Sequence, residues 1–224
     1  LANEDLIRAN VHSVWLAETG LSLGKSLKDL LDLSGDEPSL KVLDFVQEAL
    51  DSNNARIKTF QRAKEILSNI ENSLKQTDWY SETWLDGVLN QIPIQFNQAC
   101  ERWRGLYRAA KGQQKAQQKI IDDHSRSKND HDQAKRLRQE AESQIELLTE
   151  SENLIQSDFY SYRYFASEGF LPGYSFPRLP LSAYIPGRRI KGDKDEFLSR
   201  PRFLAISEFG PRSIIYHEGS RYII

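Results

Sequence analysis

The chain contains no methionine and one cysteine, Cys100. One cysteine excludes an internal disulfide, which is typical of a reducing compartment, so a cytoplasmic location is expected. No apolar run approaches the roughly 18 residues that cross a bilayer, and the N-terminal sequence lacks a basic segment followed by an apolar one. We therefore expect neither a membrane span nor a secretory signal. Because methionine is missing and the chain starts at Leu1, we expect a piece of a larger protein.

Recognisable catalytic motifs are missing too. The sequence contains no Gly-x-Ser-x-Gly, HExxH or paired CxxC motif, so no motif supports a hydrolase function or a zinc site. Residues 20–26, GLSLGKS, resemble a phosphate-binding loop but place three residues between the glycines where that loop needs four. The pattern before Gly20 is helical rather than strand-like. A helix terminator followed by a loop is therefore predicted here.

Single residues with reactive side chains have simpler explanations than chemistry. His124 and His131 lie among four aspartates, but a solvated hairpin tip explains them without a metal. Cys100 has no nearby histidine that could activate it as a nucleophile. His12 lies among apolar residues and is predicted to be a partly buried packing residue. We predict no catalytic residue, no metal site and no cofactor site, and we expect this chain not to be an enzyme by itself.

The residues that are present divide into two unlike parts. Residues 159–224 hold 14 of the 23 aromatic residues and six of the eight prolines. They carry a net charge of +4, so the first 158 residues carry −6 of the total of −2. Three regions are predicted: 1–93, 94–158 and 159–224, the last of which a longer parent chain would extend.

Residues 1–93 show the apolar spacing of a helical bundle. A helix from Asn3 to about Thr19 ends at Gly20, and a short helix spans 26–33. Pro38 suits the first position of the next helix, and Ser52 or Asn53 caps another. A further amphipathic segment is expected to stop or kink near Pro93.

Residues 94–158 form a long polar region with a thin apolar stripe, which is typical of coiled-coil helices. Turn-forming residues at 122–132, DDHSRSKNDHD, favour a chain reversal and therefore an antiparallel helical hairpin. One continuous helix of about 60 residues is the alternative, and the sequence leaves it open.

Residues 159–224 change to a strand-like pattern. Strands are predicted at 181–185, 203–209 and 213–224, with a hairpin turn at 218–220. Most aromatic rings of this region are expected to build the core of a small β domain. The predicted fold class is therefore α+β: a mainly helical bundle with a long coiled-coil-like hairpin, followed by a small, mostly antiparallel β domain.

Basic residues alternate with aromatic ones in the same region. Arginine and lysine can contact phosphates, and exposed aromatic rings can stack on bases. The candidate nucleic-acid contacts are Arg163, Arg188, Arg189, Lys191, Arg200 and Arg202.

The stretch YRYFASEGFLPGYSFPRLPLSAYIPGR (162–188), followed by FLSRPRFLAISEFGPRSIIYHEG (197–219), resembles part of the large bacterial DEAD/DEAH-type superfamily 2 helicases. Among these it looks like the DrmA-like helicases of the DISARM phage-defence system and their relatives. LIRANVHSVWLAETG (6–20) resembles the helix after their second RecA-like lobe, and AKRLRQEAESQIELL (134–148) fits a hairpin of the same proteins.

This resemblance implies a bacterial, antiviral parent protein that binds ATP and Mg²⁺ and hydrolyses ATP to move along DNA. The motifs for that reaction have no counterpart in this chain. The chain would be a non-catalytic accessory region that contacts DNA locally and works with the rest of the helicase chain. The alternative is a protein interaction module whose helical hairpin docks a partner subunit.

Overall fold

The computed structural model describes residues 3–149, 159–174, 181–185, 196–217 and 219–223. The chain divides into two compact units, Leu1–Phe176 and Pro177–Ile224. The first unit is helical, and the second combines short antiparallel strands with one helix. The predicted α+β class, with a long helical region before a small antiparallel β part, is confirmed. No helix among the described residues is both long enough and apolar enough to cross a membrane.

The helical unit starts with five short elements, which are α1 (Glu4–Thr19), η1 (Leu27–Asp29), α2 (Asp44–Leu50), α3 (Asn53–Ser68) and α4 (Glu71–Leu74). α1 begins where the Asn3 side chain accepts a hydrogen bond from the Leu6 N–H, and it ends at Gly20 with φ 66°. The Ser52 hydroxyl accepts from the Ala55 N–H at the start of α3. The predicted α1 and the predicted cap of α3 are both confirmed.

A loop replaces the helix that was predicted to start at Pro38. Residues 32–41 are closed by two backbone bonds, Asp32 N–H to Lys41 O (2.8 Å) and Leu40 N–H to Asp32 O (3.0 Å). The Asp32 carboxylate accepts from the Ser34 N–H and from the Ser39 hydroxyl. These local bonds compete with helix formation, which is why α2 begins only at Asp44 and η1 covers less than the predicted 26–33.

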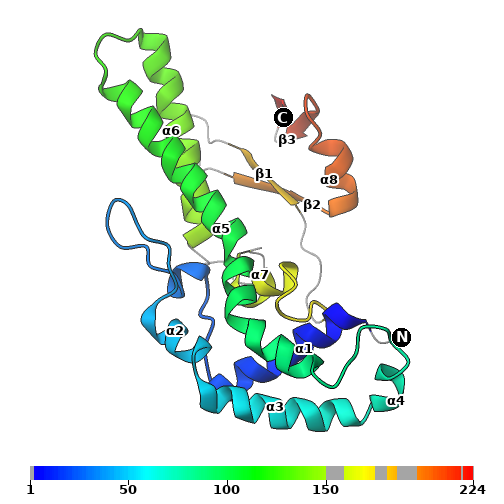
Figure 1. The fold of residues 1–224 in the computed structure, drawn as a ribbon. Coiled ribbons are helices and arrows are strands. Elements are labelled where there is room, and N and C mark those ends of the chain that lie inside the picture. The colour runs from blue at the N-terminus through cyan, green and yellow to red at the C-terminus, as the bar shows by residue number, and fades with distance from the viewer. Residues whose placement is uncertain (1–2, 150–158, 175–180, 186–195, 218, 224) are drawn as a thin grey trace. The chain divides into compact units, whose positions relative to one another are not determined.

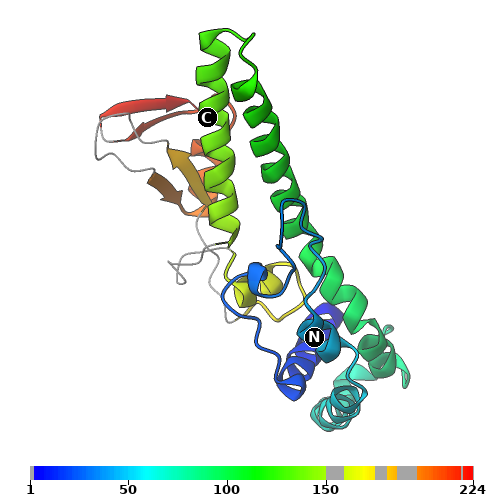
Figure 2. The ribbon, with the colours of Figure 1, turned by 90° about the vertical axis from the view of Figure 1, so that its left-hand side faces the viewer.

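Two long helices form the hairpin, α5 (Trp84–Asp122) and α6 (Lys128–Thr149). They run side by side in both views and reverse at the predicted turn (Figures 1 and 2). The hairpin is confirmed, and the single continuous helix is excluded. The helix does not stop at Pro93, so the predicted boundary between 93 and 94 falls inside α5. Burial of Leu89, Ile92 and Phe96 against the core outweighs the roughly 3 kcal/mol that a proline costs inside a helix.

The aromatic core of the helical unit includes α7 (Ser161–Ser167) and the residues that follow it. Phe165 stacks on Phe96 with ring centroids 4.8 Å apart, and Phe170 meets Trp15 edge-on at 6.3 Å. The prediction that most rings after residue 158 build a β core is wrong for Tyr164, Phe165 and Phe170, which are buried among helices. Composition marks where the sequence changes character but does not say which core a ring joins.

The Tyr164 hydroxyl connects α7 to the backbone of α5. It accepts from the Trp103 N–H (3.0 Å) and donates to the Ala99 carbonyl (2.9 Å), two groups that pair with each other in a regular α-helix. The Trp103 indole N–H donates to the Leu148 carbonyl of α6 at 3.2 Å. One buried cluster therefore joins α5, α6 and α7.

His12 packs against Phe170 in the same aromatic core. Its Nδ1 lies 2.8 Å from the Phe170 carbonyl oxygen, and its ring stacks on Phe170 at 4.4 Å. The side chain is 1% exposed, so it is a packing residue and more deeply buried than predicted. The pKa of His12 is lowered to about 4, mainly by burial; the bond to Phe170 opposes this shift, and the charge of Arg8 adds to it.

The described residues of the C-terminal unit form two antiparallel strand pairs and one helix. β1 (Leu181–Ile185) pairs with β2 (Glu196–Arg200), and β3 (Ile214–His217) pairs with β4 (Ser220–Ile223). The predicted β1 and the predicted hairpin near Gly219, which has φ 72°, are confirmed, whereas β2 was not predicted. The small core of the C-terminal unit contains Ile185, Leu198 and Ile215, with Phe209 and Tyr222 packed against them.

The strand predicted at 203–209 is wrong, because α8 (Arg202–Glu208) occupies it. Pro201 precedes the first helical turn, where its missing N–H costs nothing. Ala205 is buried, and Phe209, four residues later, packs on the core. That spacing is helical, but the run is too short for its period to be distinguished from a strand by sequence.

Substitution Tyr164→Phe should lower the free energy of unfolding by about 1–3 kcal/mol, because two buried hydrogen bonds between α7 and α5 are lost. Urea unfolding followed by circular dichroism measures the change. Tyr174→Phe is the matched control, since the Tyr174 hydroxyl bonds Asn10 at an exposed site and its loss should change stability by less than about 0.5 kcal/mol. Equal effects of the two substitutions would contradict the proposed importance of the Tyr164 bonds.

Acid should destabilise the helical unit through His12. The folded pKa is about 4 and the unfolded value about 6.5, so the stabilisation is complete above pH 6.5 and is lost as pH falls toward 4. The loss amounts to about 3 kcal/mol. Unfolding free energies measured from pH 7.5 to 4 should fall less steeply for His12→Gln than for the wild type. His124→Gln, at the exposed hairpin turn, should follow the wild-type curve, and parallel curves for all three proteins would refute this role of His12.

Candidate nucleic-acid interface

The predicted contact residues lie in different parts of the chain. Arg200 ends β2, and Arg202 begins α8, so these two are neighbours in the C-terminal unit. Arg163 is half-buried on α7 in the helical unit and does not join them there. Arg188, Arg189 and Lys191 lie outside the described residues. The predicted nucleic-acid contacts that the structure describes therefore lie on three different elements, α7, β2 and α8.

Arg200 and Arg202 have different environments. The Arg200 Nε donates to Glu208 Oε2 at 2.7 Å, a pair that ties the end of β2 to the end of α8. Arg202 is exposed. Arg200 therefore helps to hold this unit together, and Arg202 is the more exposed of the two.

Exposed aromatic residues accompany the arginines of this unit. Phe203, next to Arg202, is 73% exposed. Tyr216 is 74% exposed and lies directly opposite Arg221 in the β3–β4 register. Rings that face solvent beside guanidinium groups can stack on bases while the cations approach phosphates. The sequence prediction missed Tyr216 and Arg221, although alternation along the strand, with Ile215 inward, could have revealed them.

A second basic region, which the sequence prediction also missed, lies in α5. Residues 102–121 contain six basic residues and no acidic one. By contrast, residues 1–101 contain nine basic and sixteen acidic residues, and residues 122–158 contain five and ten. A count of charge in a moving window along the helix would have found this segment.

Arg104 is buried and is not one of the exposed basic residues of that region. Its buried guanidinium donates to the Leu40 carbonyl (Nε, 2.8 Å) and to the Asn97 carbonyl (3.2 Å). It also pairs with Glu101 at 2.7 Å. Arg104 therefore fixes the 32–41 loop against α5.

The GLSLGKS segment is not a phosphate-binding loop. The Asp29 carboxylate accepts from the Lys25 N–H (2.8 Å) and the Ser26 N–H (3.2 Å), so a fixed negative charge already occupies the amides that a phosphate would need. A helix, not a strand, precedes it. The predicted helix terminator and loop are confirmed.

The other reactive side chains are also engaged or buried. The His131 Nε2 lies 2.9 Å from the Asp123 carbonyl oxygen, and Asp123 binds Ser125 and Arg126, which lowers its pKa. No group of three or more potential metal ligands occurs within the described residues. Cys100 is fully buried, and burial raises the pKa of its thiol to about 12.

A groove of about 550 Å³ lies in the helical unit. Hydroxyl and apolar groups line it, and these belong to Ser13, Leu16, Ala17, Gly20, Leu21, Ser22, Tyr162, Leu171 and Pro172. This lining contains no carboxylate, imidazole, thiol or cation. We therefore do not place a function in the groove.

No protein-family model, curated protein or solved structure matches this chain. The functional conclusion must therefore come from the surface of the molecule and from the resemblance of its sequence.

Proposed function

We propose that this chain is a non-catalytic accessory region of an ATP-dependent DNA helicase, which contacts DNA and couples it to RecA-like lobes elsewhere in the parent protein. ATP and Mg²⁺ would bind those lobes. The proposal combines the sequence resemblance of residues 162–188 and 197–219 with the surface of the C-terminal unit.

The observation that carries the proposal is the exposure of Phe203 and Tyr216 beside arginines. The described part of this unit buries Ile185, Leu198, Ala205 and Ile215, and it gains little stability from rings that are 73% and 74% exposed. Solvent-facing aromatic side chains next to Arg202 and Arg221 are typical of surfaces on which single-stranded nucleic acid stacks. Because the chain carries a net charge of −2, contact with DNA should be local rather than continuous.

The second candidate is a protein interaction module. Ile206, Ile214 and Ile223 of the C-terminal unit are 78%, 50% and 66% exposed, which favours a partner with an apolar surface. Ile94, Leu106 and Leu147 of the hairpin are also exposed, at 59%, 41% and 40%, but the outer part of the hairpin supports docking less well. Residues 108–138, all of which the structure describes, include no exposed large apolar side chain.

Binding of the whole chain to a fluorescent oligo(dT) tests the preferred function. The double variant Phe203→Ala, Tyr216→Ala should bind about 30-fold more weakly or worse, because each of two stacked bases contributes about 1–3 kcal/mol. Fluorescence anisotropy at two salt concentrations gives the affinities. Ile206→Ala, which removes an equally exposed side chain from α8, is the control and should leave affinity unchanged.

A wild-type chain that binds no DNA at low salt would contradict the proposal. Equal losses for the double variant and for Ile206→Ala would instead favour the apolar, protein-docking role. The variant Arg188→Ala, Arg189→Ala, Lys191→Ala tests the predicted contacts outside the described residues. ATP hydrolysis by the purified chain would refute its non-catalytic character.

A further inference from the structure

We propose that Arg108, Lys111, Lys115 and Lys119 of α5 form a phosphate-binding stripe that holds the backbone of DNA along the helical hairpin. The inference rests on the proposed function and adds to it a second contact, in the other unit of the chain. None of these four residues is among the nucleic-acid contacts that were predicted from the sequence.

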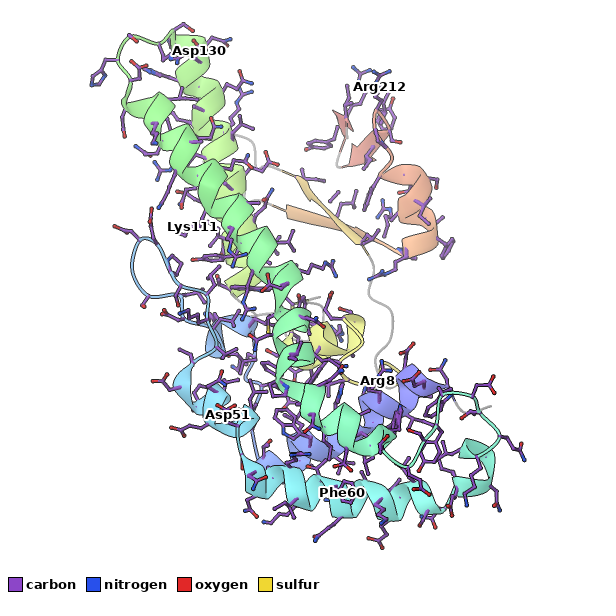
Figure 3. The ribbon with its side chains drawn as sticks, viewed as in Figure 1. Arg8, Asp51, Phe60, Lys111, Asp130 and Arg212 are labelled. Atoms are coloured by element: carbon purple, nitrogen blue, oxygen red, sulfur yellow. The ribbon has the colours of Figure 1, made fainter. Side chains whose placement is uncertain are left out.

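The four side chains share one face of α5. They recur at steps of three or four residues, which on an α-helix places them in one row. From Arg108 to Lys119 the helix rises about 16 Å, which corresponds to about five nucleotides at 3.4 Å each along one strand of a duplex. The row runs along the part of α5 that contains Lys111, beside the 32–41 loop (Figure 3).

The surface next to the row is open. Gly105, Ala109, Gly112 and Ala116 also recur at helical spacing, and all four are exposed. A Cβ atom added at Gly105 or Gly112 would meet nothing within 4 Å. A strand that follows the cations could therefore approach the helix closely, without large side chains to hold it away.

The present partners of the cations are weak. Lys115 Nζ lies 3.1 Å from Glu37, whose side chain is 88% exposed, and Arg108 lies 3.8 Å from the exposed Glu101. Exposed pairs of this kind contribute little to stability, so a phosphate can replace the carboxylate. Glu37 stands in the 32–41 loop, which the buried Arg104 holds against α5. Its carboxylate therefore competes with a phosphate for Lys115.

The chemistry of the face selects a polyanion as its occupant. A partner helix or a lipid surface would need apolar side chains on this face, and residues 108–138 expose no large ones. Residues 102–121 contain no acidic residue, so the repulsion of a polyanion by this segment comes only from neighbouring carboxylates such as Glu37 and Glu101. The phosphates of a nucleic acid suit a face that exposes cations and no large apolar side chain.

The test is the salt dependence of DNA binding by the whole chain, measured with both single-stranded and duplex probes. The variant Arg108→Gln, Lys111→Gln, Lys115→Gln, Lys119→Gln should flatten the slope of log affinity against log salt by about 2.8 on single-stranded DNA, or by about 3.6 on duplex. The matched control is Arg56→Gln, Lys58→Gln, Arg62→Gln, Lys64→Gln on α3, which makes the same change in charge and should alter the slope little.

Two further variants separate binding from folding. Glu37→Gln removes the competing carboxylate and should tighten binding about two- to fivefold. Replacement of the three lysines by arginine keeps the charge and should retain the wild-type slope, whereas a merely structural role would not distinguish arginine from glutamine in this way. Circular dichroism and urea midpoints check that the variants fold alike.

Equal slopes for the α5 and α3 variants would overturn the stripe. If the Phe203→Ala, Tyr216→Ala variant still weakened binding in that case, the proposed function would stand without it. A wild-type chain that binds neither probe would overturn both proposals together.

Discussion

The hydroxyl of Tyr164 is the interaction on which the helical unit depends. It takes part in the hydrogen bonding of α5 at Ala99 and Trp103. This hydroxyl is buried and must keep its bonds, because an unpaired buried hydroxyl costs more free energy than one hydrogen bond contributes. The Trp103 ring, held there, donates to Leu148 and so determines where α6 lies against α5. α7 is thereby attached to α5 directly and to α6 through Trp103.

The cluster around Tyr164 and Trp103 supplies the large buried residues. Small and polar contacts can therefore hold α5 and α6 together in the outer part of the hairpin. Ala110, Ala134 and Ala141 are buried between the helices, which lets them approach closely. Gln114 and Arg138 both donate to Glu142 at the same level. The outward faces of α5 are then available for charge rather than for packing, which is why the basic residues from Arg108 onward can face solvent.

Sequence reasoning found part of the candidate interface and missed the rest for identifiable reasons. Arg202 was predicted from its aromatic neighbours, and α8 indeed exposes it beside Phe203. Tyr216 and Arg221 were missed because their pairing depends on register, which the sequence does not state. Arg200 was predicted as a phosphate contact, but the fold pairs it with Glu208 because a helix follows where a strand was predicted.

The sequence by itself determined the local features that depend on neighbouring residues. Gly20 ends α1, Ser52 caps α3, and the turn formers after Asp122 reverse the chain, because capping and turn chemistry act over a few residues. Only the tertiary structure decided that α5 continues through Pro93 and that the rings of α7 join the helical core. Both outcomes arise from burial against segments distant in sequence, whose free energy exceeds that of any local preference.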